Sequence, residues 1–380
     1  MKRPYFLNKI KKAFKVHPVV AIIGPRQCGK TTLARMFANE QGDHPPENYF
    51  DLEDLHDLQR LESPQTTLSN LEGLVVIDEV QRKPHLFQTL RVLCDKKKEK
   101  QKFLILGSAS QDLLKQSSET LTGRIQYIEL TPFNFEEVQD LATLWKRGGF
   151  PRSFLAEDYS SSLIWRKSYI RTFIEQDIPN LGFKMQSEQL RRFWMMLTHY
   201  HGCFYNASEI GRSLNIPVKK IRDYADILTD TLMIRQLQPW YENISKRQVK
   251  TPKIYFRDSG LFHTLLGIES ESSLLTHPKL GSSWEGFALE EVIRHLEVDP
   301  FDCFFWASHA HAELDLLVFK GGKRLGFEFK YSDHIKVTKS MRIAMEDLKL
   351  DALVVIYPGS KSHEIEDSIH AAGLISFLGQ

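Results

Sequence analysis

Short apolar runs alternate with longer segments of helical periodicity over roughly the first 145 residues. The clearest runs are Val19–Ile23, Leu74–Ile77 and Phe103–Leu106, each flanked by glycine or by charged residues. Such runs are typical of strands in a parallel sheet that helices cover on both faces. The alternation of strand and helix predicts a doubly wound α/β domain.

Residues 2–15 combine helical apolar spacing with positive charge. Phe6, Leu7, Ile10 and Phe14 recur at helical spacing, so the segment is predicted to form an amphipathic helix. Its cationic side chains, with no acidic residue among them, are Lys2, Arg3, Lys9, Lys11, Lys12 and Lys15. The helix either packs on the next domain with a solvated charged face or contacts nucleic acid or lipid headgroups.

Two further regions follow along the chain. Residues from about 150 to 260 are mostly of helical pattern, and residues from about 275 to 380 return to mixed α/β. The short, polar, Ser-rich segment Glu269–Ser273 is predicted to be a linker. We therefore expect three domains, at residues 1–147, 148–268 and 274–380.

The composition is that of a folded protein without a strong overall charge. Apolar residues make up 42% and charged residues 26% of 380, which excludes disordered, collagen-like and coiled-coil chains. The net charge of +2 means that affinity for a polyanion must come from local patches. Four scattered cysteines, without a C-x-x-C pair, argue against zinc or disulfides. With no long apolar run or signal peptide, we expect a cytoplasmic protein that does not enter a membrane.

The strongest motif follows the first apolar run. It matches G-x-x-x-x-G-K-[ST] between a predicted strand and a predicted helix, in the string Gly24-Pro25-Arg26-Gln27-Cys28-Gly29-Lys30-Thr31-Thr32. The backbone N–H groups of such a loop surround phosphate oxygens, Lys30 reaches the β- and γ-phosphates, and Thr31 binds Mg²⁺. The string predicts a site for ATP and magnesium to which all nine residues belong.

Two carboxylates and a hydroxyl follow the other predicted strands. Asp78 and Glu79 emerge where Leu74–Ile77 ends, at the sheet edge where such folds bind ligands. We expect Asp78 to complete the Mg²⁺ shell and Glu79 to orient and deprotonate the attacking water. Ser108, at the end of the third run, either senses the γ-phosphate or belongs to a tight turn.

Eight strings of the chain resemble those of AAA-type P-loop ATPases of bacteria and archaea that carry an uncharacterised C-terminal region. They span nearly the whole chain in the family's order and are GPRQCGKTT, LVVIDEVQRKP, LILGSAS, LTGR, GGFPRS, KIYFRDSGL, GSSWEGFALEEVI and ELDLLVF…GFEFK. The resemblance implies an AAA-type ATPase domain, a helical region with a winged helix, a restriction-endonuclease-like α/β domain, and action as a homo-oligomer. It also implies that Arg124, in LTGR, contacts a γ-phosphate or a neighbouring subunit. An ion pair with a nearby acid is the alternative for Arg124.

Residues 208–239 predict a helix-turn-helix followed by a strand. Ser208–Leu214 and Val218–Leu232 have helical spacing, Asn215-Ile-Pro217 interrupts it, and Lys253–Phe256 returns as the second strand of a wing. The cationic residues of the second helix and wing predict a DNA-binding surface: Lys219, Lys220, Arg222, Lys246, Arg247, Lys250 and Lys253. Asp223 and Asp226 oppose this interpretation, and the alternative is a fold used for packing or protein contact.

Two strands of alternating pattern flank Gly321-Gly322, which is a strong hairpin signal. With these glycines as the turn, Asp315 lies opposite Glu328 and Glu313 opposite Lys330, all on one face. Two carboxylates about 5 Å apart repel by roughly 3 kcal/mol at an effective dielectric near 20. A cation or a proton is therefore expected between them.

This D…E-x-K pattern predicts a metal-dependent nuclease site. In it Asp315 and Glu328 hold Mg²⁺, Lys330 supports the attacking water or the developing charge, and Glu285 adds a carboxylate from a preceding helix. The alternatives are an inactive nuclease-like binding fold and a surface ion pair of Glu313 with Lys330. The neighbouring histidines, which either assist or are ordinary strand-edge residues, are His309 and His311.

Together these features predict a Mg²⁺-dependent AAA-type ATPase that couples ATP hydrolysis to DNA binding and, in the fullest interpretation, to metal-dependent DNA cleavage. The alternative is a nucleotide-gated scaffold or a signalling ATPase, in which an inactive nuclease-like domain binds a protein.

Overall fold

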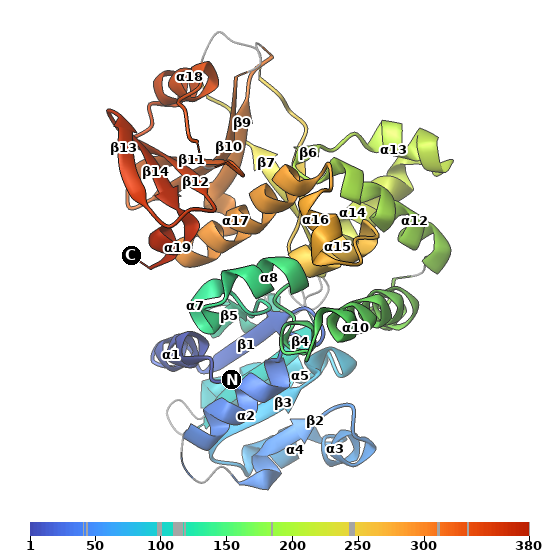
Figure 1. Ribbon diagram of the computed structural model, residues 1–380. Helices are drawn as coiled ribbons and strands as arrows, with labels where there is room; N and C mark the ends of the chain where they lie inside the picture. Colours follow the sequence, from blue (N-terminus) through green and yellow to red (C-terminus); the bar gives the residue numbers. More distant parts are fainter. Residues whose placement is uncertain are drawn as a thin grey trace. The chain divides into compact units, whose positions relative to one another are not determined.

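A computed structural model describes the chain except for residues 41, 43, 44, 97–100, 109–116, 118, 184, 243–247, 310, 311, 333 and 380. The chain forms two compact units (Figure 1). The first unit comprises Met1–Pro132 with Asp230–Leu232, and the second comprises Phe133–Thr229 with Met233–Gln380. No helix in the described part of the chain is long and apolar enough to cross a membrane.

The first unit contains a five-stranded parallel sheet of order β2-β3-β4-β1-β5. Its strands are β1 (Val19–Gly24), β2 (Tyr49–Asp51), β3 (Gly73–Asp78), β4 (Gln101–Ser108) and β5 (Ile125–Glu129). The three predicted apolar runs are β1, β3 and β4, whereas β2 and β5 were not predicted. All six residues of β1 are buried, as expected of a central strand.

Helices cover both faces of this sheet, which confirms the doubly wound α/β prediction. On one face lie α1 (Pro4–Ala13) and α2 (Lys30–Glu40), and on the other α4 (Pro64–Ser69) and α5 (Leu86–Lys96). The short helix α3 (Leu55–Arg60) follows β2. Helix α1 is the predicted amphipathic helix, and it buries Phe6, Leu7 and Ile10 against the sheet.

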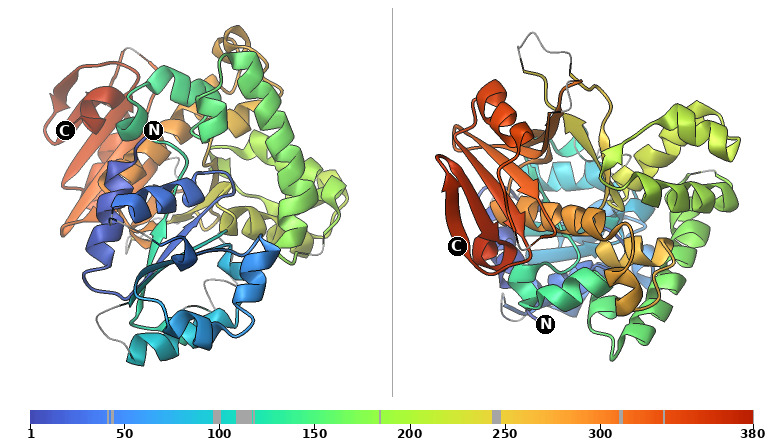
Figure 2. Two further views of the ribbon diagram at one scale, coloured as in Figure 1. Left: turned by 90° about the horizontal axis from the view of Figure 1, so that it is seen from below. Right: turned by 45° about the horizontal axis from the view of Figure 1, so that its top comes forward.

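The second unit begins with a helical part, most of which has its own apolar core, whereas its first helices bury Phe135, Leu144 and Trp145 in the core beside the C-terminal sheet. Its helices, drawn from green to orange in Figure 2, are α7 (Phe135–Val138), α8 (Leu141–Arg147), α9 (Pro151–Phe154), α10 (Tyr159–Thr172), the π-helix η3 (Phe173–Asp177), α11 (Ile178–Asn180), α12 (Ser187–Leu197), α13 (Ala207–Leu214), α14 (Val218–Asp230), α15 (Ser259–Leu265) and α16 (Glu271–Leu275). Asn215, with φ of 54°, ends α13 in the left-handed conformation, so the predicted turn lies between α13 and α14.

One segment differs from its prediction. Residues 269–273 were expected to be a linker, but they lead into helix α16 instead. Ser270 caps this helix, because its hydroxyl accepts the N–H of Ser273 while the Ser273 hydroxyl bonds back to Ser270. A Ser-rich segment can therefore be a helix start as readily as a linker.

A nine-stranded mixed sheet runs through the second unit in the order β13-β14-β12-β11-β10-β9-β7-β8-β6. Its strands are β6 (Cys203–Phe204), β7 (Ile234–Pro239), β8 (Lys253–Phe256), β9 (Cys303–Ala307), β10 (Glu313–Lys320), β11 (Lys323–Phe329), β12 (Ala352–Tyr357), β13 (Ser362–Glu366) and β14 (Ile369–Gly373). Helices α17 (Leu280–Leu296) and α19 (Leu374–Leu378) cover one face and α18 (Lys339–Leu348) the other. Because β7 pairs in parallel with β9, the strands after the helix-turn-helix continue into the C-terminal sheet. The boundaries of the three expected domains stay predictions.

The predicted hairpin is present with the predicted register. Strands β10 and β11 pair from Leu316↔Phe327 to Lys320↔Lys323 around Gly321 and Gly322, whose φ angles are 59° and 76°. A β-bulge that was not predicted places two residues of β10, Asp315 and Leu316, opposite the single residue Phe305 of β9. Bulges re-aim side chains and are frequent beside functional sites.

Two glycines of α17 provide a matched test of packing. A Cβ added at Gly286 would lie 2.2 Å from Nε2 of His201, whose ring stacks on Phe262 and accepts the N–H of Phe256. A Cβ at Gly281 would meet nothing within 4 Å. We predict that Gly286→Ala lowers the free energy of unfolding by about 1–3 kcal/mol, because the buried ring must move. Gly281→Ala should be neutral or slightly stabilising. Equal values for the two variants in urea unfolding would contradict this close packing.

Candidate functional site

The phosphate-loop motif occupies the carboxyl end of β1. Gly24 is the last residue of the strand, and Lys30 is the first of helix α2. A Cβ at Gly24 would lie 2.4 Å from the carbonyl oxygen of Leu130, so a side chain does not fit. Gly29 has φ of 100°, a conformation that side chains rarely adopt. The two motif glycines are thus required by packing and by backbone conformation respectively.

Lys30 lies beneath this loop with only 6% of its surface exposed. Its Nζ donates to the carbonyl oxygens of Gly24, at 3.1 Å, and Pro25, at 3.0 Å. Both of these partners are uncharged. Burial raises the pKa of the Asp78 and Glu79 carboxyls, and the charge of the nearby Lys30 ammonium opposes this rise, so all three groups lie at one sheet edge.

Asp78 joins β3 to the phosphate loop. Its Oδ2 accepts the hydroxyl of Thr31 at 2.7 Å and that of Tyr49 at 3.1 Å, and its Oδ1 accepts the N–H of Glu79 at 2.9 Å. Burial raises the pKa of Asp78, while these donors and Lys30 oppose the rise. Two residues 47 apart in the sequence are thus in contact, as the motif requires. Their oxygens are of the kind that Mg²⁺ prefers, so the site fits this ion.

Glu79 and Ser108 lie at the same edge. Glu79 has φ of 54°, which costs a residue with a side chain roughly 1–2 kcal/mol, and the amide of Gln81 donates to its carboxylate. Burial raises the pKa of Glu79, whereas Lys30 lowers it. Ser108 ends β4 and pairs in register with Gly24. The structure therefore brings the predicted Lys30, Thr31, Asp78, Glu79 and Ser108 to one sheet edge.

Arg124 is not part of this group. It directly precedes β5, and its carbonyl oxygen accepts the N–H of Val19 at 3.1 Å, so it lies at the amino edge of the sheet. Six residues of strand, roughly 16–20 Å, separate that edge from the phosphate loop. Its guanidinium pairs with Asp95, with Nε 2.8 Å from Oδ1. A γ-phosphate contact within the same chain was therefore a wrong prediction, and the alternative ion pair is confirmed. A contact with a neighbouring subunit stays a prediction.

A second cluster of charges lies in the second unit. Strands β10 and β11 bring together Asp315, Glu328 and Lys330, with Nζ of Lys330 2.7 Å from Oε2 of Glu328 and 3.7 Å from Oδ2 of Asp315. The N–H of Phe329 also donates to Asp315. The D…E-x-K residues thus lie close together, as predicted, although the paired register of the hairpin ends at Leu316↔Phe327 and does not include the predicted pairs of Asp315 with Glu328 and Glu313 with Lys330.

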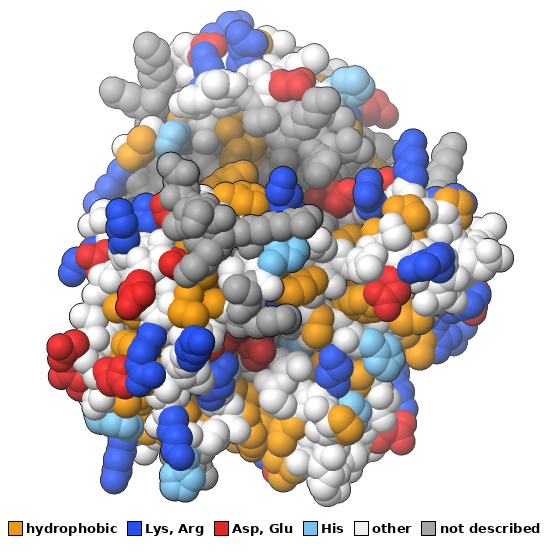
Figure 3. Space-filling model, turned by 90° about the horizontal axis from the view of Figure 1, so that it is seen from above, with side chains coloured by type: hydrophobic (Ala, Val, Ile, Leu, Met, Phe, Trp, Pro, Cys, Tyr) orange, Lys and Arg blue, Asp and Glu red, His pale blue; other side chains and the backbone are white. Residues whose placement is uncertain are grey.

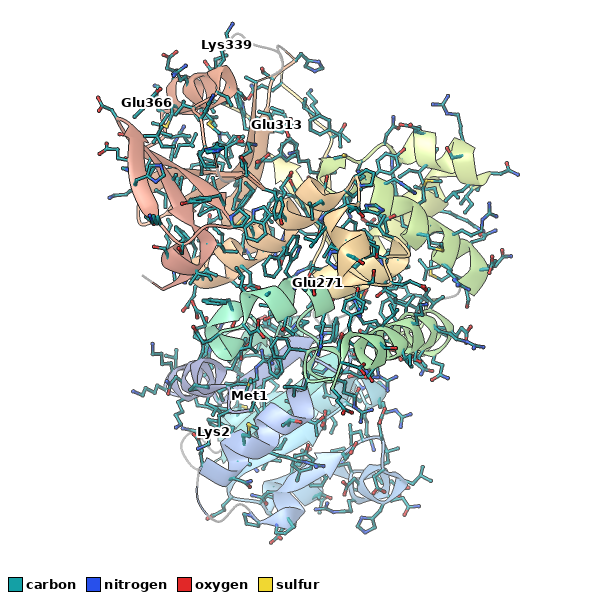
Figure 4. The ribbon with its side chains drawn as sticks, in the orientation of Figure 1. Met1, Lys2, Glu271, Glu313, Lys339 and Glu366 are labelled. Atoms are coloured by element: carbon teal, nitrogen blue, oxygen red, sulfur yellow. The ribbon has the colours of Figure 1, made fainter. Side chains whose placement is uncertain are left out.

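Lys253 completes this cluster, although the sequence predicted another role for it. It was predicted as a cationic residue of a surface wing, but it is 2% exposed because β8 lies between β7 and β6. Its ammonium contacts Glu313, lies 3.5 Å from Oδ1 of Asp315, and lies 4.0 Å from Oε1 of Glu285. Figure 4 labels Glu313 on its strand. The cation that pairs with Glu313 is therefore Lys253, and no Glu313–Lys330 ion pair is found among the described residues.

The charges of this cluster are balanced by protons and ammonium groups. Burial, followed by the charge of Asp315, raises the pKa of Glu285 to about 7 and that of Glu328 to about 8. Burial works to lower the pKa of Lys253 and Lys330, but the neighbouring groups, Tyr255 and Asp315 for Lys253 and Asp315 and Glu328 for Lys330, outweigh it and raise both. Both lysines therefore stay charged at neutral pH. The cation expected between the carboxylates is an ammonium group of the chain itself.

The predicted magnesium site of Glu285, Asp315 and Glu328 stays a prediction. In the described part of the chain, no group of three or more His, Cys, Asp or Glu side chains is placed to hold a metal ion. The physical reason is that Lys253 and Lys330 lie among the carboxylates. Of the two histidines considered, His309 is exposed two residues after β9, and His311 lies outside the described residues.

The sequence did not single out Tyr49 or Tyr255, and it placed Lys253 on a surface wing rather than among buried acids. Tyr49 begins the short strand β2, and its hydroxyl donates to Asp78. Tyr255 follows Lys253 on the same face of β8 and donates to Oε1 of Glu285 at 2.7 Å. A lysine and a tyrosine alternating within an otherwise apolar run was the available signal for a polar face. The acids that Lys253 and Tyr255 contact lie 30 or more residues further along the chain, so the sequence pattern could not show that these side chains are close in space.

The helix-turn-helix presents its predicted cations to solvent. On α14, Lys219, Lys220 and Arg222 are exposed, and so are Asp223 and Asp226. Lys250 is also exposed, whereas two other predicted wing residues, Lys246 and Arg247, lie outside the described residues. Figure 3 shows Lys and Arg side chains interspersed with Asp and Glu across the face that it draws. Any DNA contact here would therefore depend on a small patch rather than on an extended positive surface.

Three family models match successive parts of the chain. Residues 16–139 match an AAA domain, residues 138–272 match a domain of unknown function (DUF8612), and residues 280–377 match another (DUF4143). Two curated relatives are the uncharacterized proteins Rv2008c of Mycobacterium tuberculosis and Mb2031c of Mycobacterium bovis. Each is 45% identical over 365 residues, which cover 96% of this chain and 81% of the relative.

Solved structures show more distant likeness. The Walker-type ATPase PABY2304 of Pyrococcus abyssi is 18% identical with a TM-score of 0.46, over 70% of this chain and 95% of that one. A RuvB variant of Thermotoga maritima is 17% identical with a TM-score of 0.30, over 62% of this chain and 90% of that one. The 45% identity over most of both sequences places the chain in the family of the two mycobacterial proteins, with an AAA-type, P-loop ATPase-like domain at its N-terminal end.

Proposed function

We propose that this protein is a Mg²⁺-dependent ATP hydrolase of the AAA type. The observation that carries the proposal is the 2.7 Å hydrogen bond between Thr31 and Asp78 beside the phosphate loop. The loop N–H groups and the N-terminus of α2 would bind the phosphates, and Lys30 would exchange its carbonyl partners for phosphate oxygens. Thr31 and Asp78 would hold Mg²⁺, directly or through water. Bound Mg²⁺ would neutralise charge on the β- and γ-phosphates.

Glu79 is the proposed general base. Its carboxylate lies at the carboxyl edge of the sheet next to Asp78, and Gln81 holds it by a hydrogen bond. Because burial raises its pKa, it is a stronger proton acceptor than an exposed glutamate. In this role it would orient a water molecule and remove its proton during attack on the γ-phosphate.

We predict that Glu79→Gln lowers the rate of ATP hydrolysis by about 100-fold or more while Mg²⁺–ATP still binds, because the amide cannot take a proton. Lys30→Met should weaken binding itself. The exposed Lys12→Met variant is the matched control and should behave like the unaltered protein. The measurements are phosphate release and nucleotide titration. A wild-type hydrolysis rate in Glu79→Gln would show that Glu79 is not the base.

We also propose that the second unit binds DNA through a winged helix. The elements β6, α13, α14, β7 and β8 follow one another in the order of that fold, and β8 pairs antiparallel with both β6 and β7. Lys219, Lys220 and Arg222 near the start of α14 would contact phosphates or base edges. The two exposed aspartates on the same helix restrict the contact to its first turns.

Replacing Lys219, Lys220 and Arg222 together by Ala should weaken binding to duplex DNA. The binding constant should also depend less steeply on salt. The slope of its logarithm against the logarithm of the salt concentration should shrink by roughly 0.9 for each phosphate that the variant no longer neutralises. A control with Lys323, Lys336 and Lys339 replaced removes the same charge from other exposed positions and should change the slope little. Fluorescence anisotropy at several salt concentrations measures both. If the unaltered protein does not bind DNA even at low salt, a scaffold that binds another protein becomes the better interpretation.

At the nuclease-like cluster, the geometry favours a fold that does not cleave DNA. Asp315, Glu328 and Lys330 have the arrangement of a D…E-x-K site, but the Lys253 ammonium lies among the acids where a metal ion would be needed. We propose that Lys253 takes the place of that ion and that the C-terminal domain is an inactive nuclease-like fold. The carboxylates then serve the stability of the sheet.

Lys253→Met should lower the free energy of unfolding by about 1–3 kcal/mol, because Glu285 and Asp315 lose a buried cation while Lys330 still pairs with Asp315 and Glu328. The exposed Lys323→Met control should change it by less than about 0.5 kcal/mol. The unaltered protein is expected to leave plasmid DNA intact in Mg²⁺ or Mn²⁺. Metal-dependent nicking that Asp315→Asn abolishes and Lys30→Met retains would reverse this assignment and identify an active nuclease.

A further inference from the structure

Arg3, at the start of the chain, contacts the phosphate loop of the same unit. It is 4% exposed, and its guanidinium donates to the carbonyl oxygens of Cys28 at 3.2 Å, Thr131 at 3.0 Å and Pro132 at 3.5 Å. The group also lies over the ring of Phe6, 4.6 Å from its centroid. In the sequence Arg3 was one of several cations of a basic helix, and nothing distinguished it from Lys2 or Lys9.

The contact with Cys28 has a consequence for the next residue. Cys28 and Gly29 share a trans peptide bond, since no cis bond occurs among the described residues. In a planar trans peptide the carbonyl and the N–H point in opposite directions. A guanidinium that holds the Cys28 oxygen on one side therefore directs the Gly29 N–H to the other side, away from α1. Gly29 has φ of 100° and no side chain, so sterics restrict the orientation of this peptide less than they would at another residue.

The other two partners give Arg3 a fixed support. Thr131 and Pro132 follow β5, which pairs with β1 in the sheet. The guanidinium thus connects the loop that leaves β1 with the chain that leaves β5. Its planar group offers several N–H donors in a rigid arrangement, whereas a lysine ammonium is a single compact donor group. An arginine is accordingly suited to hold three carbonyl oxygens from two segments at once.

We propose that Arg3 is a positioning residue for the phosphate loop. It holds the Cys28–Gly29 peptide in the orientation that aims the Gly29 N–H at a phosphate oxygen before nucleotide binds. This role rests on the proposed binding of ATP to the loop. Arg3 acts through the backbone of the loop and does not itself contact the nucleotide.

A purely structural role for Arg3 makes a different prediction. Helix α1 buries Phe6, Leu7 and Ile10 in the core of the first unit, so its docking has an apolar anchor that does not depend on Arg3. If Arg3 only fastened the helix, its replacement would lower thermal stability and leave the affinity of the folded protein for phosphates unchanged. If it positions the loop, affinity falls in protein that is still folded.

The test uses the full chain with Arg3→Met and Arg3→Lys, and with Lys2→Met as the matched control. Lys2 is the exposed neighbour that Figure 4 labels at the start of the chain. Titrations employ Mg²⁺–ATP and, as a probe of the phosphate loop alone, Mg²⁺–pyrophosphate. We expect the Kd of Arg3→Met for both probes to rise roughly 10- to 100-fold, the range for removal of a hydrogen bond to a charged group. Arg3→Lys should lie in between, and Lys2→Met should equal the unaltered protein.

Chemical rescue provides a second readout in case the Arg3→Met variant folds poorly. Arg3→Ala leaves room for a small guanidinium ion, so millimolar methylguanidinium should restore part of the affinity, and tetramethylammonium at the same ionic strength should not. Unchanged Kd values in folded Arg3→Met and Arg3→Lys would overturn the inference and leave the proposed ATP site intact. Failure of the unaltered protein to bind either probe would instead overturn the proposed function, and this inference with it.

Discussion

The hydrogen bond between Thr31 and Asp78 is the interaction on which the first unit's chemistry depends. It exists because β1 and β3 run parallel, so the loop after one strand and the carboxylate ending the other meet at one edge. The same constraint brings Ser108 beside Gly24 and leaves Arg124 at the opposite edge. Residues at the carboxyl ends of the strands can share a ligand, whereas a residue before a strand cannot reach it.

The second unit depends on a different constraint, the neutralisation of buried charge. Three largely buried acidic side chains, Glu285, Asp315 and Glu328, converge near the start of β10 with the partly exposed Glu313, and two lysines lie among them. Removing such charges from water is costly unless each has a partner. Lys253 supplies that partner from β8, so the strand that the sequence pattern assigns to a wing is bound electrostatically to the hairpin. The nine-stranded sheet is held together across this point by charge as well as by backbone pairing.

The sequence predicted those parts whose signals are local. Strands β1, β3 and β4 have continuous apolar runs, the phosphate loop is a contiguous motif, and Gly321-Gly322 determines the hairpin register. Strand β2 has only three residues, and β5 buries only one of its five, so neither forms an apolar run. The surroundings of Lys253 depend on residues far along the chain, and the bulge at Asp315 leaves no mark in the pattern of the strand. Tertiary pairing of charges was therefore the main element that sequence periodicity could not supply.

The central claim, that Thr31 and Asp78 act together on a magnesium-bound nucleotide, is tested most directly by a double-mutant cycle. The affinity of Mg²⁺–ATP is measured by calorimetry for the unaltered protein, Thr31→Val, Asp78→Asn and the double variant, at one magnesium concentration. Residues that serve one ion are strongly non-additive, so the double variant should lose little more affinity than the worse single variant. Losses that simply add, or a folded unaltered protein that takes up no nucleotide, would contradict the account.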